Sequence, residues 1–157
     1  MQVVLMPSTL NDKMCYPVGE KMDDNKPYIN EMIKTFNSIE AFKDKNITFI
    51  CRGSSGAIIA GIFCMNIPNS KILHIKKEGE RSHDDSAYLG RSTENIRVIV
   101  DDFMCSGETL NAIYDRLGKA NRSLDEVRID CLVLSGEVDL EKLSFRPEYL
   151  VCGKVKK

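Results

Sequence analysis

Residues 96–109 of the chain read IRVIVDDFMCSGET, and this stretch decides the expected fold. The apolar, mostly β-branched run 96–100 predicts a buried strand, and the polar, glycine-containing residues 101–107 predict a turn. From 108 to 120 apolar residues recur at spacings of three and four, which predicts an amphipathic helix that ends near Gly118 and Asn121. A buried strand, a turn and a helix in this order are typical of a parallel α/β sheet.

The same alternation of strand and helix extends to both sides of this unit. Apolar periodicity and runs of β-branched residues predict helices at 24–42 and 57–65 and strands at 47–51, 71–75 and 127–134. We therefore expect an α/β fold with one parallel sheet flanked by helices on both faces. A length of 157 residues fits a single domain over 1–157.

The composition excludes several classes of protein. Hydrophobic residues make up 43% and charged residues 29% of the chain, which is typical of a globular protein. Because the chain has 22 basic and 23 acidic residues, its net charge is close to zero, and no basic surface for nucleic acid is expected. The apolar run 57–65 is too short to cross a bilayer, and the first ten residues do not resemble a secretion signal, so we expect a cytoplasmic protein without a membrane partner.

Six cysteines are scattered along the chain without a CxxC pair. This spacing argues against a zinc site and against a disulfide framework. We expect most of them to be small buried side chains, with Cys105 in the turn as the exception.

Polar side chains follow the strand 96–100 at the point where ligands bind in parallel sheets. Asp101 and Asp102 provide carboxylates that accept hydrogen bonds from a ribose diol or hold a hydrated cation. Ser106, Gly107 and Thr109 lie at the start of a helix, where backbone N–H groups and the dipole favour a phosphate. Together these groups fit a ribose 5-phosphate; the alternative is a pair of solvated acids before an ordinary capped helix.

The stretch 98–109 resembles the phosphoribosyl diphosphate (PRPP) signature of the type I phosphoribosyltransferases. The resemblance implies that family's fold with a small hood, and transfer of ribose 5-phosphate from PRPP to a nucleobase, with purine salvage favoured. Diphosphate leaves, a nucleoside monophosphate forms, and Mg²⁺ enters with the diphosphate, held mainly by water and substrate oxygens near the acidic pair. Asp101 and Asp102 would bind the ribose hydroxyls in catalysis, and the 5-phosphate would be held by Cys105, Ser106, Gly107, Glu108 and Thr109.

A second glycine-containing turn follows the strand 47–51. Glycines allow close approach of the backbone to a ligand, and consecutive amides with serine hydroxyls can bind an anion. The turn is similar to the family's diphosphate loop, although Ser54 replaces the second glycine. The resemblance implies diphosphate binding by Arg52, Gly53, Ser54 and Ser55; taken alone, the turn is equally consistent with a plain strand-to-helix connection.

Residues 76–95 form a long polar stretch without helical or strand periodicity. Loops of this length are usually functional or disordered. Type I enzymes close such a loop over the reacting carbon, and the stretch from Lys76 to Tyr88 resembles that loop in adenine-type members. Lys76 or Lys77 would neutralise the leaving diphosphate. The alternative is a solvated charged loop, which is favoured for His83, Asp84 and Asp85.

The segment 145–153 is similar to the stretch with which hypoxanthine-guanine-type members stack an aromatic ring on the base. Tyr149 would supply the stacking ring, or would be a core residue of a last strand. Ser135 stands where those purine enzymes place a lysine, which leaves the base preference open.

Two departures from the signature bear on the mechanism. Cys105 stands where related enzymes carry Asp or Ala, and we do not assign it as a general base. Glu108 must point outward for the loop to bind phosphate. These departures keep open a catalytically silent PRPP- or nucleotide-binding regulatory protein of the same fold, and a structural domain without a small ligand. Family members often form homodimers, but the chain itself gives no independent sign of one.

Overall fold

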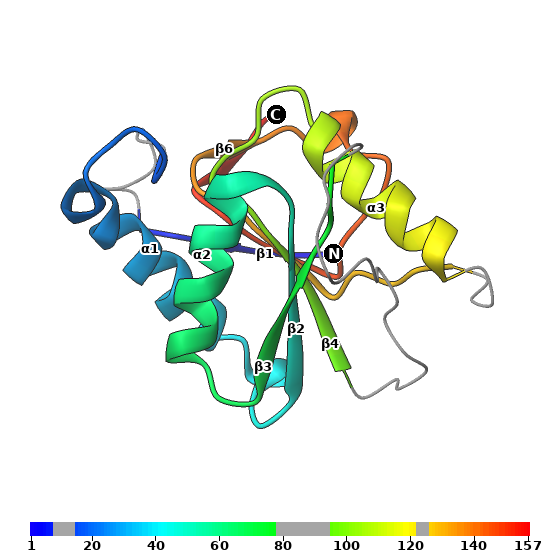
Figure 1. The fold of residues 1–157 in the computed structure, drawn as a ribbon, viewed down its shortest axis with the longest axis horizontal. Coiled ribbons are helices and arrows are strands. Elements are labelled where there is room, and N and C mark those ends of the chain that lie inside the picture. The colour runs from blue at the N-terminus through cyan, green and yellow to red at the C-terminus, as the bar shows by residue number, and fades with distance from the viewer. Residues whose placement is uncertain (8–14, 78–94, 122–125) are drawn as a thin grey trace.

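The centre of the molecule is a six-stranded parallel sheet (Figure 1). The computed structural model describes residues 1–7, 15–77, 95–121 and 126–157. In chain order the strands of the sheet are β1 (Gln2–Leu5), β2 (Asn46–Cys51), β3 (Ser70–His74), β4 (Asn95–Val100), β5 (Cys131–Val133) and β7 (Tyr149–Cys152). They lie in the order β1-β7-β5-β4-β2-β3, and every pair is parallel. The predicted fold class is confirmed.

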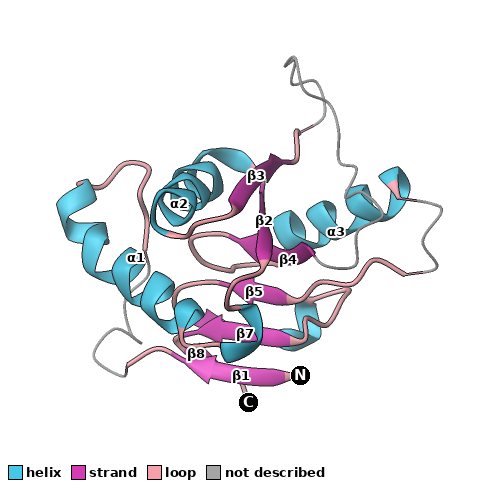
Figure 2. Cartoon of the chain, turned by 90° about the horizontal axis from the view of Figure 1, so that it is seen from below, coloured by secondary structure: helices cyan, strands magenta, loops and turns pink. Residues whose placement is uncertain are grey.

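Helices cover both faces of this sheet, as Figure 2 shows. The helices α1 (Met22–Asn37) and α2 (Gly53–Asn66) lie on one face, and α3 (Glu108–Ala120) lies on the other. Side chains of β2 alternate accordingly, because Phe49 packs in the core under α1 and α2 while Ile50 packs in the core under α3. Phe36 and Phe63 meet Phe49 at ring-centroid distances of 5.6 and 5.2 Å. A sheet buried on both faces explains the continuously apolar strands.

Smaller elements lie at the margins of the main sheet. A second parallel pair consists of β6 (Glu137–Val138) and β8 (Lys154–Val155). Two short 3₁₀ helices, η2 (Glu40–Phe42) and η3 (Leu140–Lys142), connect larger elements. In the described part of the chain, no helix combines the length and the apolarity that a membrane span requires.

The predicted helix 24–42 is divided in the structure. The helix α1 ends at Asn37, where the last turn tightens: the backbone N–H of Ser38 is shared between the carbonyls of Lys34 and Thr35, and its hydroxyl donates to the carbonyl of Thr35. The chain then continues through η2, where Phe42 is buried like the helical residues before it. The apolar periodicity therefore identified the buried face correctly and missed the break.

Other helix and strand boundaries also differ from the predictions. The differences occur where the sequence is rich in glycine and serine and where a strand pairs with distant segments of the chain. The helix α2 begins at Gly53, not at 57, since its first turn lacks the large apolar side chains that periodicity detects. The strand predicted at 127–134 is ordered as a strand only over β5, although Val127 and Ile129 are also buried. A last strand was expected only as the core alternative for Tyr149 and without bounds; in the structure it is β7, which pairs with both β1 and β5.

The cysteines behave largely as expected. All six are free, and four of them, Cys15, Cys51, Cys131 and Cys152, are buried. Cys64 is half-buried and Cys105 is exposed. Within the described ranges, no three His, Cys, Asp or Glu side chains converge as a metal site would require.

Candidate active site

The acidic pair lies at the carboxyl end of β4, the position from which parallel sheets bind ligands. Asp101 donates its backbone N–H to the carbonyl of Val133 at 3.2 Å, and the carbonyl of Asp102 accepts the N–H of Ser135 at 2.8 Å. These bonds continue the β4–β5 pairing beyond the strands. Both aspartates are 8% exposed, so neither is a solvated surface acid.

Backbone groups fix the two carboxylates in place. Oδ1 of Asp101 accepts the N–H of Asp102 at 2.9 Å, and Oδ1 of Asp102 accepts the N–H of Phe103 at 2.7 Å. Burial and, next, the charge of Asp102 raise the pKa of Asp101 to about 7, while the charge of Lys77 acts in the opposite direction. Two carboxylates buried together store repulsion that hydroxyl donors or a cation would relieve.

The turn that follows the acidic pair leads into α3. Gly107 has a φ of +83°, a conformation in which a side chain is strained, and α3 begins at Glu108. The hydroxyl of Ser106 accepts the N–H of Glu108 at 3.3 Å. Cys105, Ser106 and Glu108 are exposed, and Thr109 is half-buried. The start of α3 therefore lies at the surface of the molecule, directly after the acidic pair in the chain, and a helix N-terminus in this position favours an anion.

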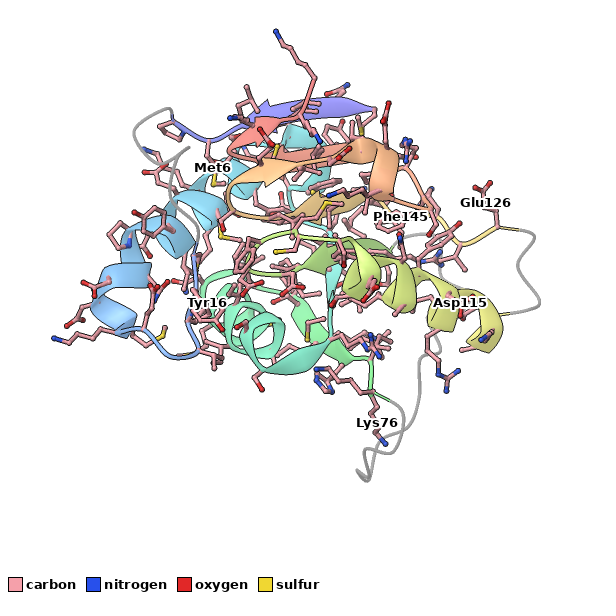
Figure 3. The ribbon with its side chains drawn as sticks, turned by 90° about the horizontal axis from the view of Figure 1, so that it is seen from above. Met6, Tyr16, Lys76, Asp115, Glu126 and Phe145 are labelled. Atoms are coloured by element: carbon pink, nitrogen blue, oxygen red, sulfur yellow. The ribbon has the colours of Figure 1, made fainter. Side chains whose placement is uncertain are left out.

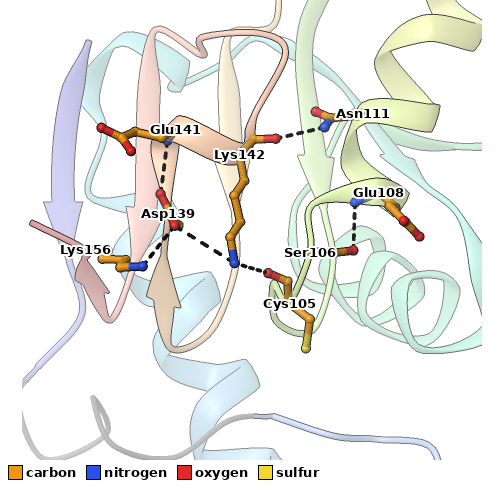
Figure 4. Close-up of polar contacts among 8 residues, drawn as sticks. All are labelled: Cys105, Ser106, Glu108, Asn111, Asp139, Glu141, Lys142 and Lys156. Atoms are coloured by element: carbon orange, nitrogen blue, oxygen red, sulfur yellow. Dashed lines mark hydrogen bonds and ion pairs between the residues drawn. The ribbon is translucent and has the colours of Figure 1, made fainter.

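The helix η3, which is distant in the sequence, contacts this turn and the first part of α3 (Figure 4). Nζ of Lys142 donates to the carbonyl of Cys105 at 3.2 Å, and Nδ2 of Asn111 donates to the carbonyl of Lys142 at 2.9 Å. A Cβ added at Gly107 would lie 3.2 Å from that same carbonyl, so η3 and the turn are in close contact. Lys142 was not predicted as a site residue, because no local pattern links it to a turn more than thirty residues earlier.

The second predicted turn meets the acidic pair through Gly56. A Cβ added there would lie 3.3 Å from Oδ1 of Asp101, so the start of α2 packs directly against the carboxylate. Gly53 has a φ of +78°, and a Cβ at that position would lie 3.9 Å from Nζ of Lys77. Arg52 precedes the helix in extended conformation, with Ser54 exposed and Ser55 half-buried. The structure therefore brings the 52–55 turn, Lys77 and Asp101 together.

The remaining predicted residues of the long loop are placed only in part. Lys76 is half-buried and lies where the chain leaves β3, at the outer margin of the molecule in Figure 3. His83, Asp84, Asp85 and Tyr88 lie outside the described residues.

Tyr149 is not brought to this site. It is the first residue of β7 and pairs in register with Cys131, which in turn pairs with Val98. Three residues of strand, about 10 Å, therefore separate the level of Tyr149 from that of Asp101. Its ring is half-buried and packs edge-on against Phe42 at 5.1 Å, against the core on the α1 side. This placement matches the core alternative for Tyr149 and leaves the ring about 10 Å along the strand from the acidic pair.

The hydroxyl of Ser135 makes two hydrogen bonds within the fold. Its hydroxyl donates to the carbonyl of Asp102 and accepts the N–H of Cys15 at 3.0 Å. The segment that begins at Cys15 is thereby attached to the carboxyl edge of the sheet. Sequence analysis did not assign the following residue, Tyr16, whose ring lies 5.9 Å from that of Phe103. No sequence signal links two rings so far apart in the chain.

Comparison with solved structures identifies the class of fold. The chain has the fold of the type I phosphoribosyltransferases. It matches an adenine phosphoribosyltransferase from Thermoanaerobacter pseudethanolicus with a TM-score of 0.56 at 15% identity, over 85% of this chain and 83% of that one. It matches a hypoxanthine-guanine phosphoribosyltransferase from Bacillus anthracis with a TM-score of 0.52 at 15% identity, over 87% of this chain and 79% of that one.

A third solved structure is consistent with the other two. It is a hypoxanthine phosphoribosyltransferase from Staphylococcus aureus, with a TM-score of 0.51 at 13% identity over 89% of this chain and 84% of that one. No protein-family model and no curated protein matches the sequence. At these identities the likeness describes the fold, and the reaction must be argued from the site itself.

Proposed function

We propose that this protein transfers the 5-phosphoribosyl group of PRPP to a nucleobase and releases diphosphate. The observation that carries the proposal is the buried pair Asp101 and Asp102, located between the turn at Gly107 and the start of α2. A carboxylate pair flanked by two helix N-termini suits a sugar that carries a phosphate at one end and a diphosphate at the other. The signature resemblance and the fold of the solved neighbours support the same reaction.

Each part of the site has a role in this proposal. Asp101 and Asp102 accept hydrogen bonds from the ribose hydroxyls. The turn 105–109 binds the 5-phosphate through its amides and hydroxyls. The turn 52–55 and Lys77 bind the diphosphate, and Lys76 adds positive charge near it. The two aspartates offer only oxygen donors, which suits Mg²⁺, and the ion would supply further neutralisation of the diphosphate when bound.

The reaction needs little covalent chemistry from the protein. A ring nitrogen of the base forms a bond to C1 of the ribose, while the bond from C1 to the diphosphate oxygen breaks and the diphosphate leaves with the electron pair. The proton of the attacking ring nitrogen passes to water or to the departing diphosphate. The cation of Lys77 and the amides of the 52–55 turn stabilise that developing charge. The acidic pair orients the ribose, so its contribution is mainly one of positioning.

Calorimetric titration with PRPP and magnesium tests the binding site. We expect Asp101→Asn, Asp102→Asn and Thr109→Val each to weaken PRPP binding at least about tenfold, since one lost interaction with a charged group corresponds to about 1.5–3 kcal/mol. Asp115→Asn on α3 is the matched control, because that carboxylate is exposed and pairs only with Lys119 among the described contacts. Unchanged affinity in all three site variants rejects the pocket.

A panel of purine and pyrimidine bases then tests turnover. Release of diphosphate with any base supports the transferase. PRPP binding without diphosphate release supports instead a regulatory protein that binds PRPP or nucleotides. One observation supports this second function. Tyr149, the residue predicted to stack on the base, lies at the end of the sheet opposite to the acidic pair.

A further inference from the structure

A cavity of about 810 Å³ lies beside Phe103, the residue that directly follows the acidic pair. Its other walls come from the chain before α1 and from the first turns of that helix. The volume is within the usual range for sites that bind small molecules. None of the functional roles assigned above uses this cavity.

One wall of the cavity is a pair of aromatic rings. Tyr16 and Phe103 meet with ring centroids 5.9 Å apart and planes tilted by 47°, and Tyr28 of α1 also lines the space. Tyr16 is 43% exposed and Phe103 is half-buried, so both rings have free surface. Aromatic surface of this kind favours a flat aromatic ligand over a flexible one.

Hydrogen bonds on both sides hold Tyr16 in place. The N–H of Cys15 donates to Ser135 on the sheet at 3.0 Å, and the N–H of Tyr16 donates to Oδ1 of Asn25 on α1 at 2.7 Å. Asn25 is buried and donates in return to the carbonyls of Tyr16 and Lys21. The wall is therefore preorganised, which reduces the entropy lost when a ligand binds.

The polar groups that line the cavity are predominantly hydrogen-bond acceptors. Glu20, Asp23 and Asp24 contribute carboxylates, and none of the described lining residues is basic. Glu20 lines the same cavity as Phe103, the neighbour of Asp102 in the chain. The charges of Asp102 and Glu20 both act on Cys15, where they add to burial, the largest cause, in raising the pKa of that thiol to about 12. Ionised carboxylates only accept hydrogen bonds, so a ligand edge that faces them must donate.

We propose that this cavity is the nucleobase site and that it selects bases with an exocyclic amino group over their oxo counterparts. The inference rests on the proposed function. Phe103 follows Asp102 directly and lines the cavity, so a base attached to C1 of a ribose held by the acidic pair is within reach of this cavity. The base then lies against Tyr16 and Phe103 and directs its amino group to Glu20. An oxo group at the same position would face a carboxylate and be repelled.

Two comparisons between free purine bases of nearly identical shape test this selection at saturating PRPP. Adenine and hypoxanthine differ at C6, and guanine and xanthine differ at C2, by an amino against an oxo group. We expect kcat/KM to be at least about tenfold higher for the amino member of at least one pair, the order of discrimination that one unpaired polar group produces. Glu20→Gln should reduce this ratio severalfold, because an amide can donate to an oxo group.

Variants of the aromatic wall give a second readout. Tyr16→Ala should raise the KM for the base about tenfold and leave the Kd for PRPP unchanged, and Tyr16→Phe should restore the KM. Glu40→Gln is the matched control for Glu20→Gln, because Glu40 in η2 is exposed, pairs with Lys43 and does not line the cavity. Since Glu20 is also exposed, its substitution leaves the core intact even if Tyr16→Ala does not fold.

The outcomes separate this inference from the proposed function. Absence of PRPP binding rejects the proposed function. Normal PRPP binding with equal kcat/KM for amino and oxo bases, or with ratios unchanged in Glu20→Gln, overturns the base site alone. If PRPP binds and no base reacts, calorimetric titration of adenine and of hypoxanthine into the PRPP complex replaces the kinetics, and equal affinities overturn the inference.

Discussion

Replacement of Asp101 by Asn should stabilise the protein at neutral and alkaline pH while weakening PRPP binding. The carboxyl group is buried beside Asp102, and its pKa is raised from 3.8 to about 7. Asn has nearly the same shape and keeps an oxygen that can accept the N–H of Asp102. The substitution therefore removes a buried charge without removing its main hydrogen bond.

The raised pKa fixes the sign of the pH dependence. Between 3.8 and about 7 the unfolded chain has lost the proton from this carboxyl while the folded chain retains it, so wild-type stability falls as pH rises through this window. Two pH units, from about pH 5 to about pH 7, at about 1.4 kcal/mol per unit, correspond to about 3 kcal/mol. The advantage of Asp101→Asn over wild type should grow by that amount between about pH 5 and about pH 7 and then stay constant.

Urea unfolding at a series of pH values measures this difference. Circular dichroism is the suitable signal, because the chain has no tryptophan. Asp115→Asn serves as the control and should show no such growth, since that carboxylate is exposed on α3. An Asp101→Asn protein less stable than wild type at about pH 8, or a difference independent of pH, would refute the electrostatic account of the acidic pair.

Three further substitutions test the supports of the site and the core. Gly107→Ala introduces a side chain at a φ of +83° and 3.1 Å from Cε of Met104, so thermal unfolding should show a loss of about 1–3 kcal/mol and calorimetry weaker PRPP binding. Lys142→Met removes the donor to the carbonyl of Cys105, and we expect a severalfold higher Kd for PRPP with a loss of stability of no more than about 1 kcal/mol, measured by urea unfolding. Phe49→Ala should cost about 3–5 kcal/mol in the same unfolding assay, because the ring is fully buried between Phe36 and Phe63.

The strand β4, the turn after it and the helix α3 were predictable because their signals are contiguous. Apolar β-branched residues, two acids, a glycine and a helical period follow one another within 25 residues, and each acts on its own stretch of backbone. The helix α2 was placed correctly but begins four residues earlier than predicted. Its first turn is formed by glycines and serines, which carry no hydrophobic period.

Features that depend on distant pairing were not predictable in this way. The strand β7 lies between β1 and β5 only because backbone hydrogen bonds join three segments that are far apart in the chain. The same pairing places Tyr149 at the amino end of the sheet, where the local motif alone could not assign it. Likewise, Lys142 reaches the turn at Cys105 through the tertiary fold.

The sequence by itself determined the parallel α/β class, the two turns at the carboxyl edge and the acidic pair, because local apolar patterns and turn residues specify these elements. Only the tertiary structure decided that Lys77 and Gly56 meet Asp101, that Tyr149 belongs to the core, and that Tyr16 forms a wall with Phe103. The physical reason is that strand register and helix packing fix which distant side chains share a cavity, and neither is encoded in any single stretch of the chain.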